Sequence, residues 1–288
     1  MKPEIKIENL HTTFSPNWCP GCGNLNIWGA LKEAAVKEGW DNTNTVLVAG
    51  IGCHGHMVNF VKLTSFEGLH GRALPVATGI KLANHKLNVF VLTGDGDCLG
   101  EGGNHFLHTC RRNHDLTILL HDNALYALTT GQASPVTQRG VKTKSTPQGN
   151  PDEPISPLAI AIAAGATFAA RAYSGDMPKL TDLIIEANKH VGLAVIDILQ
   201  PCVTFNKICT HAFFQENTYY LGEDYDQTNR EAAFTKALEF GPKKIPLGIF
   251  YISEKASYES QISQISEKTL VEQDPNVKNI NELFKKYT

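Results

Sequence analysis

The stretch from Val89 to Gln132, VFVLTGDGDCLGEGGNHFLHTCRRNHDLTILLHDNALYALTTGQ, decides the fold of this chain. It contains two apolar runs, Val89–Leu92 and Leu116–Leu120, which indicate buried parallel strands with a helical segment between them. Polar residues follow each run directly. Because ligands of an open α/β sheet bind beyond the carboxyl ends of its strands, we expect these polar residues to lie at one functional edge.

The polar residues at this edge have the chemistry of a site for magnesium and a phosphate group. The first run ends in Gly94-Asp95-Gly96-Asp97, and Asn123 follows the second run. Magnesium prefers oxygen ligands, some from the protein and others from phosphate. The two glycines let the backbone approach a phosphate, and a helix N-terminus favours its charge. A GDG turn alone is common, but together with an asparagine at the end of the next strand it indicates a magnesium–phosphate site.

Composition limits the classes of protein to which the chain can belong. Its 288 residues are 42% hydrophobic and 19% charged, which suits one large α/β domain or two small ones. A net charge of −3 gives no reason to expect nucleic acid or an anionic membrane as a partner. No apolar run approaches the roughly 20 residues of a membrane-spanning helix, and MKPEIKIENLH lacks the apolar core of a signal peptide. We therefore expect a cytoplasmic protein that binds neither nucleic acid nor membrane.

Strand and helix patterns alternate along most of the chain. The expected strands are Val46–Ala49, Val89–Leu92, Leu116–Leu120, Thr167–Ala172 and Gly192–Leu199, and the expected helices are Asn24–Lys37, Pro75–Leu82, Pro157–Ala164 and Met177–Lys189. This alternation predicts a doubly wound, mostly parallel α/β sheet within a domain of residues 1–212.

The remaining segments fit this pattern less well. Residues 213–288 are expected to form a C-terminal extension that contacts a partner subunit, with one more strand at Leu247–Ile252 and a polar tail with a short helix at its end. The long polar segment Ala133–Ser156 is expected to be a lid or a surface covered by a partner, because structureless loops of this length are usually functional.

Four cysteines are expected on the functional edge. Cys19 and Cys22 form a CPGC turn, Cys53 follows the first strand, and Cys202 follows the last expected strand. Four thiolates from separate loops suit a structural zinc or an iron–sulfur cluster. Zinc ribbons normally use two CxxC pairs, the spacing is not that of a ferredoxin, and a thioredoxin-like CxxC would not need Cys53 or Cys202. Cys209 competes with Cys202 for the fourth position.

Two further cysteines, Cys98 and Cys110, lie in helical contexts and are expected to be packed small residues.

The motifs CPGCGN, GIGC, HGRA, GDGD, GGNH, RRN, TGQASP and PCVTFN, in this order, resemble the β subunit of 2-oxoacid:ferredoxin oxidoreductases over residues 15–210. The resemblance implies a thiamine-diphosphate-binding fold that carries thiamine diphosphate, Mg²⁺ and one [4Fe–4S] cluster and works with an α subunit. It also implies oxidative decarboxylation of a 2-oxoacid, pyruvate or 2-oxoglutarate, to acyl-CoA and CO₂. The electrons would pass through the cluster to ferredoxin.

The resemblance assigns roles to individual residues. The implied cluster ligands are Cys19, Cys22, Cys53 and Cys202, and the implied magnesium ligands are Asp95, Asn123 and the backbone carbonyl of Leu125. The implied cofactor-binding residues are Ile51, Gly52, Cys53, His70, Gly94, Asp95, Gly96, Asp97, Asn123 and Leu125. His70 and Thr130 are the implied catalytic residues.

Two positions depart from the family pattern. Relatives usually have a serine after GIGC, where this chain has His54, and TGGQ or TKGQ where it has Thr129-Thr130-Gly131-Gln132. Thr130 stands where relatives vary with substrate preference, so the departure leaves the choice of 2-oxoacid open.

Two other functions stay open at this point. One is a non-oxidative thiamine lyase or carboligase whose cysteines are incidental or bind zinc. The other is a non-catalytic electron-transfer module, which would bind no thiamine diphosphate. The chain has one doubly wound unit, spanning residues 46–199, and a second unit of the same kind needs well over ~100 further residues. We therefore expect the pyrimidine-binding half of a thiamine site to come from another polypeptide.

Overall fold

A single eight-stranded sheet forms the centre of the computed structural model, which describes residues 5–274, 281, 284, 285 and 287. The strands are β1 (Thr45–Ala49), β2 (Thr64–Glu67), β3 (Asn88–Gly94), β4 (Thr117–Asp122), β7 (Phe168–Tyr173), β8 (Ala194–Leu199), β9 (Thr218–Tyr220) and β10 (Ile245–Ile252), in the spatial order β2-β1-β3-β4-β8-β7-β10-β9. The first six run parallel, whereas β10 pairs antiparallel with β7 and carries β9 parallel to itself. The predicted mostly parallel α/β sheet is confirmed.

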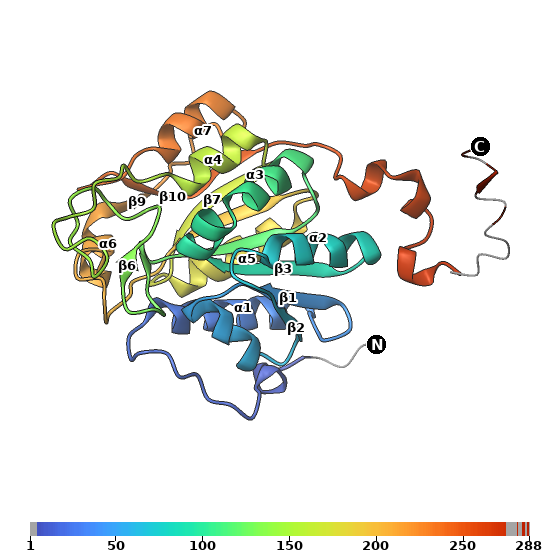
Figure 1. The fold of residues 1–288 in the computed structure, drawn as a ribbon, viewed down its shortest axis with the longest axis horizontal. Coiled ribbons are helices and arrows are strands. Elements are labelled where there is room, and N and C mark those ends of the chain that lie inside the picture. The colour runs from blue at the N-terminus through green and yellow to red at the C-terminus, as the bar shows by residue number, and fades with distance from the viewer. Residues whose placement is uncertain (1–4, 275–280, 282–283, 286, 288) are drawn as a thin grey trace.

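Helices cover both faces of the sheet (Figure 1). The helices α1 (Gly23–Glu38) and α5 (Met177–Lys189) pack together on one face, and α2 (Ala73–Ala83), α3 (Gly103–Arg112), α4 (Pro157–Ala164) and α7 (Arg230–Ala237) cover the other. Neighbouring strand residues such as Leu47 and Val48 belong to different apolar cores, because successive side chains of a strand point to opposite faces. Strands buried on both sides explain the continuous apolar runs of the sequence.

Helix ends follow local capping signals. The Ser156 hydroxyl accepts a hydrogen bond from the Ala159 N–H before α4, and Gly165 ends that helix at a φ of 105°. The Asp176 carboxylate accepts one from the Lys179 N–H before α5. These caps explain why both helices have the bounds predicted from the sequence.

Several elements were absent from the sequence prediction. The edge strand β2 is fully exposed and has no apolar pattern, and the segment after Gly94 begins as a π-helix over Gly96–Glu101 before α3. The short α6 (His211–Asn217), α7 and β9 lie in the C-terminal part, where apolar periodicity is weak. The strand expected at Leu247–Ile252 is present as β10, and it joins the main sheet. The boundary at residue 212 and the partner contact stay predictions.

The segment Ala133–Ser156 is largely irregular after the short pair of β5 (Leu125–Tyr126) and β6 (Gln132–Ala133). Asn150 holds it together, since its side chain donates to the Thr137 carbonyl at 2.7 Å and its carbonyl accepts from the Gly140 N–H at 2.8 Å. Its role as a lid or partner-covered surface stays a prediction.

After β10 the chain leaves the sheet and continues in short 3₁₀ turns (Figure 1). These turns contact the body, since Glu259 is buried against His114 and Lys86 Nζ lies 2.6 Å from Glu272 Oε1. The short helix expected at the very end of the chain falls mostly outside the described residues.

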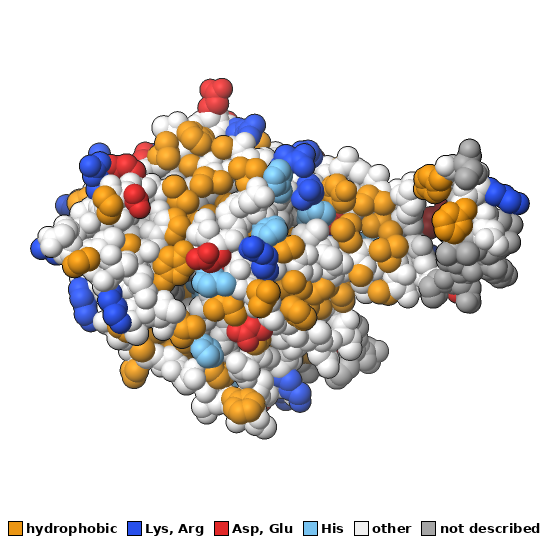
Figure 2. Space-filling view, viewed as in Figure 1, with side chains coloured by type: hydrophobic (Ala, Val, Ile, Leu, Met, Phe, Trp, Pro, Cys, Tyr) orange, Lys and Arg blue, Asp and Glu red, His pale blue; other side chains and the backbone are white. Residues whose placement is uncertain are grey.

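One face of the molecule carries charges of both signs. Figure 2 shows acidic, basic and apolar side chains interspersed on one face of the molecule. Across the part of the chain that the structure describes, no helix has both the length and the apolar character to cross a bilayer.

Candidate active site

The carboxyl ends of β1, β3, β4 and β8 meet at one edge of the sheet, as the sequence predicted. The backbone joins them: the Gly50 N–H donates to the Leu92 carbonyl at 2.9 Å, and the Gln200 N–H donates to the Asp122 carbonyl at 2.7 Å. A cavity of about 70 Å³, here called the GDG cavity, opens there. It is lined by Ile51, Gly52, Cys53, His54, His70, Gly94, Asp95, Gly96, Asp97, Asn123, Leu125, Tyr126, Ala127, Leu128 and Thr129. All ten expected cofactor-binding residues are therefore neighbours.

Asp97 connects three loops of this cavity. Its Oδ1 accepts hydrogen bonds from the Gly71 N–H at 2.7 Å and the Ile51 N–H at 3.1 Å, and it lies 2.7 Å from His70 Nδ1. Its Oδ2 accepts from the Thr93 hydroxyl at 2.7 Å. Asp97 therefore fixes the loop positions and the orientation of the His70 imidazole, so its carboxylate already has internal partners.

The surroundings of Asp97 are tightly packed. A Cβ at Gly50 would lie 1.8 Å from Asp97 Oδ2, so only glycine fits there. His54 is buried, and its Nε2 lies 3.7 Å from the same oxygen. Burial opposes ionisation of Asp97, but the nearby His54 imidazole, followed by the hydrogen bonds from Gly71 and Thr93, outweighs it and lowers the Asp97 pKa.

Asp95 and Asn123 have the chemistry expected of magnesium ligands. The Asp95 side chain is buried, and the Ser134 hydroxyl donates to its Oδ2. Burial raises the Asp95 pKa despite that bond, because the ionised carboxylate is cut off from water. A bound cation would stabilise the ionised carboxylate in place of that water. The Asn123 amide donates to Gln200 Oε1 at 3.0 Å, which directs its own oxygen to the Leu125 N–H at 3.1 Å.

This donor set fits a magnesium–diphosphate group. It offers one carboxylate, one amide oxygen and backbone carbonyls, which is the oxygen-rich set that magnesium accepts alongside phosphate. The packing of the cavity wall requires glycine on either side of Asp95, since a Cβ would lie 2.9 Å from the His54 ring at Gly94 and 2.4 Å from the Tyr126 ring at Gly96. The magnesium roles themselves stay predictions.

A second cavity, of about 280 Å³, contains the four expected cluster cysteines. This cysteine cavity is lined by Asn17, Trp18, Cys19, Cys22, Cys53, His56, Asn123, Ala127, Leu128, Gln200, Cys202, Val203, Thr204 and Phe205. Burial, followed by the charges of Cys202, Cys53 and Cys19, raises the Cys22 pKa to about 12. A cationic iron centre in this cavity would stabilise the cysteines as thiolates and so overcome the effect of burial.

No group of three or more His, Cys, Asp or Glu side chains, among the residues that the structure describes, is arranged to hold one metal ion. The cysteines surround a space instead. A cavity lined by four cysteines fits a multi-iron cluster, in which each thiolate binds a different iron.

Hydrogen bonds hold the cysteine segments together. Trp18 Nε1 donates to the Cys53 carbonyl at 2.6 Å, which ties the N-terminal arm to the loop after β1. Gln200 Nε2 lies 3.3 Å from Cys22 Sγ, and Thr204 Oγ1 lies 3.0 Å from Cys19 Sγ. Such donors to sulfur tune the potential of an iron–sulfur centre.

Cys209 lies apart from the cysteine cavity. It packs in an apolar cluster with Tyr173, Leu199, Phe214, Ile245 and Leu247. Its backbone N–H donates to Asn206 Oδ1 at 2.8 Å. The geometry therefore favours Cys202 as the fourth ligand.

Cys98 and Cys110 are both buried in the apolar core beneath α3, as expected for packed small residues.

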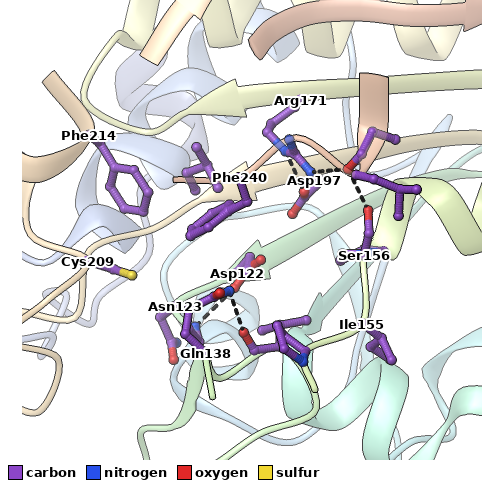
Figure 3. A pocket seen from close by; sticks show the side chains of 17 residues that line it. Asp122, Asn123, Gln138, Ile155, Ser156, Arg171, Asp197, Cys209, Phe214 and Phe240 are labelled. Atoms are coloured by element: carbon purple, nitrogen blue, oxygen red, sulfur yellow. Dashed lines mark hydrogen bonds and ion pairs between the residues drawn. The ribbon is translucent and has the colours of Figure 1, made fainter. Parts of the chain in front are cut away.

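Figure 3 shows a further cavity, of about 190 Å³, which Asn123 also lines and in which Arg171 points toward Asp197. The Arg171 Nε lies 2.8 Å from Asp197 Oδ2, and both side chains are buried. Burial, followed by the charges of Asp197 and Asp95, raises the pKa of Asp122 at the end of β4. The buried Arg171–Asp197 ion pair and the Asp122 carboxyl group therefore line the same cavity as Asn123, which is also a residue of the GDG cavity.

Thr130 is the one expected site residue that does not line either cavity at this edge. It borders a neighbouring cavity of about 410 Å³, together with Lys142, Lys144 and Lys207, which is here called the lysine cavity. Its φ of 80° is unusual for a β-branched residue and indicates a turn held by its surroundings.

Sequence reasoning missed the side chains that support the expected ligands, chiefly Ser134, Gln200 and Trp18. Each lies in or beside a recognised motif: Ser134 in TGQASP, Gln200 before PCVTFN and Trp18 before CPGCGN. Proximity to a motif was the only available signal, because their contacts depend on segments far away in the sequence.

Comparison with known proteins identifies the family. Residues 50–198 match the thiamine pyrophosphate enzymes through their C-terminal TPP binding domain, and residues 202–267 match the C-terminal region of the beta subunit of pyruvate ferredoxin oxidoreductase. The chain is 41% identical over 287 residues to 2-oxoacid:ferredoxin oxidoreductase 1, subunit beta, from Aeropyrum pernix, covering 96% of this chain and 90% of the relative. It is 46% identical over 264 residues to the subunit beta from Saccharolobus solfataricus, covering 87% and 86%.

A solved structure agrees with these sequence matches. The 2-oxoglutarate:ferredoxin oxidoreductase from Magnetococcus marinus, with 2-oxoglutarate, coenzyme A and succinyl-CoA bound, superimposes with a TM-score of 0.91 at 34% identity. The match covers 99% of this chain and 97% of the other. The resemblance inferred from the motifs is confirmed: this chain belongs to the β subunits of the 2-oxoacid:ferredoxin oxidoreductases.

Proposed function

We propose that this chain, with an α subunit, catalyses the oxidative decarboxylation of a 2-oxoacid to acyl-CoA and CO₂ and passes the electrons to ferredoxin. A β subunit of this family implies an α partner. When bound, thiamine diphosphate supplies the group that attacks the 2-oxo carbon and holds the electrons left by CO₂. The protein residues supply binding, orientation and an exit for those electrons.

The observation that carries this proposal is the contact between the two cavities. Cys53 and Asn123 line both the GDG cavity and the cysteine cavity. A [4Fe–4S] cluster on Cys19, Cys22, Cys53 and Cys202 would therefore lie beside the cofactor. A non-oxidative lyase or carboligase has no use for a redox centre in that position.

Individual residues have distinct roles in the proposal. Asp95, Asn123 and the Leu125 carbonyl hold magnesium, and Asp97 orients His70 at the cavity wall. Cys19 is exposed whereas Cys22 and Cys202 are buried, so the Cys19 side is where the cluster would face ferredoxin.

The test is to co-express the chain with its α subunit, purify the complex without oxygen, and analyse iron, sulfide and thiamine diphosphate. Viologen reduction with pyruvate or 2-oxoglutarate is then measured with and without coenzyme A. We expect reduction that depends on both substrates. Decarboxylation without viologen reduction would favour a lyase, and a cluster without bound thiamine diphosphate would favour an electron-transfer module.

A further inference from the structure

Three ionisable side chains lie on one face of neighbouring strands, at the edge of the sheet that carries the GDG cavity. Arg171 on β7 and Asp197 on β8 are direct register partners, and Asp122 on β4 lies two residues beyond Leu120, the register partner of Asp197. Because side chains two residues apart on a strand share a face, all three point to the face that α2, α3, α4 and α7 cover. They line one cavity together (Figure 3).

Arg171 and Asp197 form a buried ion pair, and Asp122 is joined to it. Arg171 Nε donates to Asp197 Oδ2 at 2.8 Å, and the two side chains are 3% and 1% exposed. The Asp122 carboxyl group forms a hydrogen bond with that of Asp197. Two carboxyl groups form a hydrogen bond only through a proton, so Asp122 is the donor and Asp197 is the ionised partner of Arg171.

The other oxygen of the Asp122 carboxyl group holds the turn that carries expected magnesium ligands. Asp122 Oδ1 accepts a hydrogen bond from the Ala124 N–H at 3.0 Å. Ala124 has a φ of 58°, a left-handed conformation that a residue with a Cβ seldom adopts unless its surroundings hold it. Asn123 and Leu125 flank Ala124, so this conformation sets the directions of the Asn123 amide oxygen and the Leu125 carbonyl.

Stability alone gives a poor account of the buried ion pair. Such a pair contributes little net stability, since the removal of both charges from water offsets their attraction. Arg171 and Asp197 line neither the GDG cavity nor the cysteine cavity. Asp122 connects them to the turn of residues 122–125, which indicates that the pair serves to fix the geometry of that turn.

We propose that Asp122, held by the Arg171–Asp197 ion pair, is a positioning residue that fixes the magnesium-binding turn. The inference rests on the proposed function, in which Asn123 and the Leu125 carbonyl hold the magnesium of thiamine diphosphate. Asp122 acts through two hydrogen bonds, as a donor to Asp197 and as an acceptor from Ala124. An asparagine offers the same donor and acceptor, whereas a leucine of similar size offers neither.

The experiment uses the assembled complex of α subunit and chain, and it compares Asp122→Leu and Asp122→Asn with the wild type. Calorimetry measures the affinity for thiamine diphosphate, and the magnesium concentration that gives half-maximal binding is determined separately. Asp226→Leu is the matched control, because Asp226 is exposed, lines neither cavity and accepts a bond of the same kind from the Thr228 N–H at 2.9 Å. Iron content and thermal unfolding report on the fold of each variant.

We expect Asp122→Leu to weaken thiamine diphosphate binding by roughly ten- to a hundredfold and to raise the half-maximal magnesium concentration, since loss of an outer-shell partner of a metal site has an effect of that size. Asp122→Asn should retain most of the binding, Asp226→Leu should bind as the wild type does, and iron content should not change. If Asp122→Leu does not fold, the double variant Arg171→Met/Asp197→Leu replaces the ion pair by apolar side chains and should weaken binding in the same direction.

Wild-type affinity in Asp122→Leu or in the double variant would overturn the proposal. An equal loss of affinity in Asp122→Leu and Asp122→Asn would also overturn it, because the effect would then belong to a negative charge on Asp122 and not to its two hydrogen bonds. Failure of the proposed function looks different, because the wild-type complex itself would then bind no thiamine diphosphate.

Discussion

The GDG cavity and the cysteine cavity share a wall but are built differently. The GDG cavity takes its groups from turns directly after neighbouring strands of one sheet, β1, β3 and β4. The cysteine cavity takes its thiols from an N-terminal arm and two loops, tied together by Trp18, Gln200 and Thr204. The sheet therefore fixes the first cavity, whereas side-chain contacts, and in our proposal the iron itself, hold the second.

This difference predicts that the two cavities respond differently to the substitution of a ligand residue. Loss of a ligand residue in the GDG cavity should lower the affinity for thiamine diphosphate and leave the shape of the cavity unchanged, because strand pairing holds the backbone. Loss of a ligand in the cysteine cavity should also loosen the surrounding loops, because metal binding contributes to their folding. The following predictions test this contrast.

The largest effect is expected from removing the partner, since in our proposal the thiamine site then lacks its pyrimidine-binding half. The isolated chain, purified with its iron, should reduce viologen with 2-oxoacid and coenzyme A roughly a hundredfold or more slowly than the complex, because the group that activates the cofactor is missing. If the isolated chain turned over substrate at the rate of the complex, the pyrimidine-binding half would have to lie in this chain.

Cys202→Ser should strip or destabilise the cluster, because serine is a poor ligand for iron. Iron content and the electron paramagnetic resonance signal after dithionite reduction measure this loss. Cys209→Ser is the matched control and should retain both, since Cys209 packs in a separate apolar cluster. Loss of iron from Cys209→Ser but not from Cys202→Ser would instead identify Cys209 as the fourth ligand.

Asp95→Ala should weaken magnesium-dependent binding of thiamine diphosphate by roughly a hundredfold or more, since even the loss of an outer-shell partner costs about ten- to a hundredfold. Iron content should stay at the wild-type level, because Asp95 does not line the cysteine cavity. Calorimetric titration of the complex measures the affinity. Wild-type affinity in this variant would place the magnesium site elsewhere.

The smallest effect concerns a single hydrogen bond to sulfur. Thr204→Val removes the hydroxyl that lies 3.0 Å from Cys19 Sγ. Without this hydrogen bond the reduced cluster is less stable, so the reduction potential should become more negative while the iron content is unchanged. Redox titration followed by electron paramagnetic resonance tests this, and Thr204→Ser, which keeps the hydroxyl, should restore the potential.

The local sequence alone determined the parallel sheet and the placement of Asp95, Asn123 and Cys53 at its functional edge. Asp95 and Asn123 follow buried strands directly, Cys53 lies in the turn after β1, and parallel strands end at a common edge. The bounds of α4 and α5 were equally predictable, because their caps are local. The exposed strand β2 and the elements of the C-terminal part had no apolar periodicity from which to predict them.

Only the tertiary structure decided which distant groups meet. The sequence left Cys202 and Cys209 as competitors, and the fold separates them because the chain turns between the two residues and buries Cys209 against β7, β8 and β10. The sequence likewise could not predict that Asp97 links three loops, or that Lys144 and Lys207 line one cavity. Such contacts join residues far apart along the chain, and only the packing of the sheet and its loops sets the distances between them.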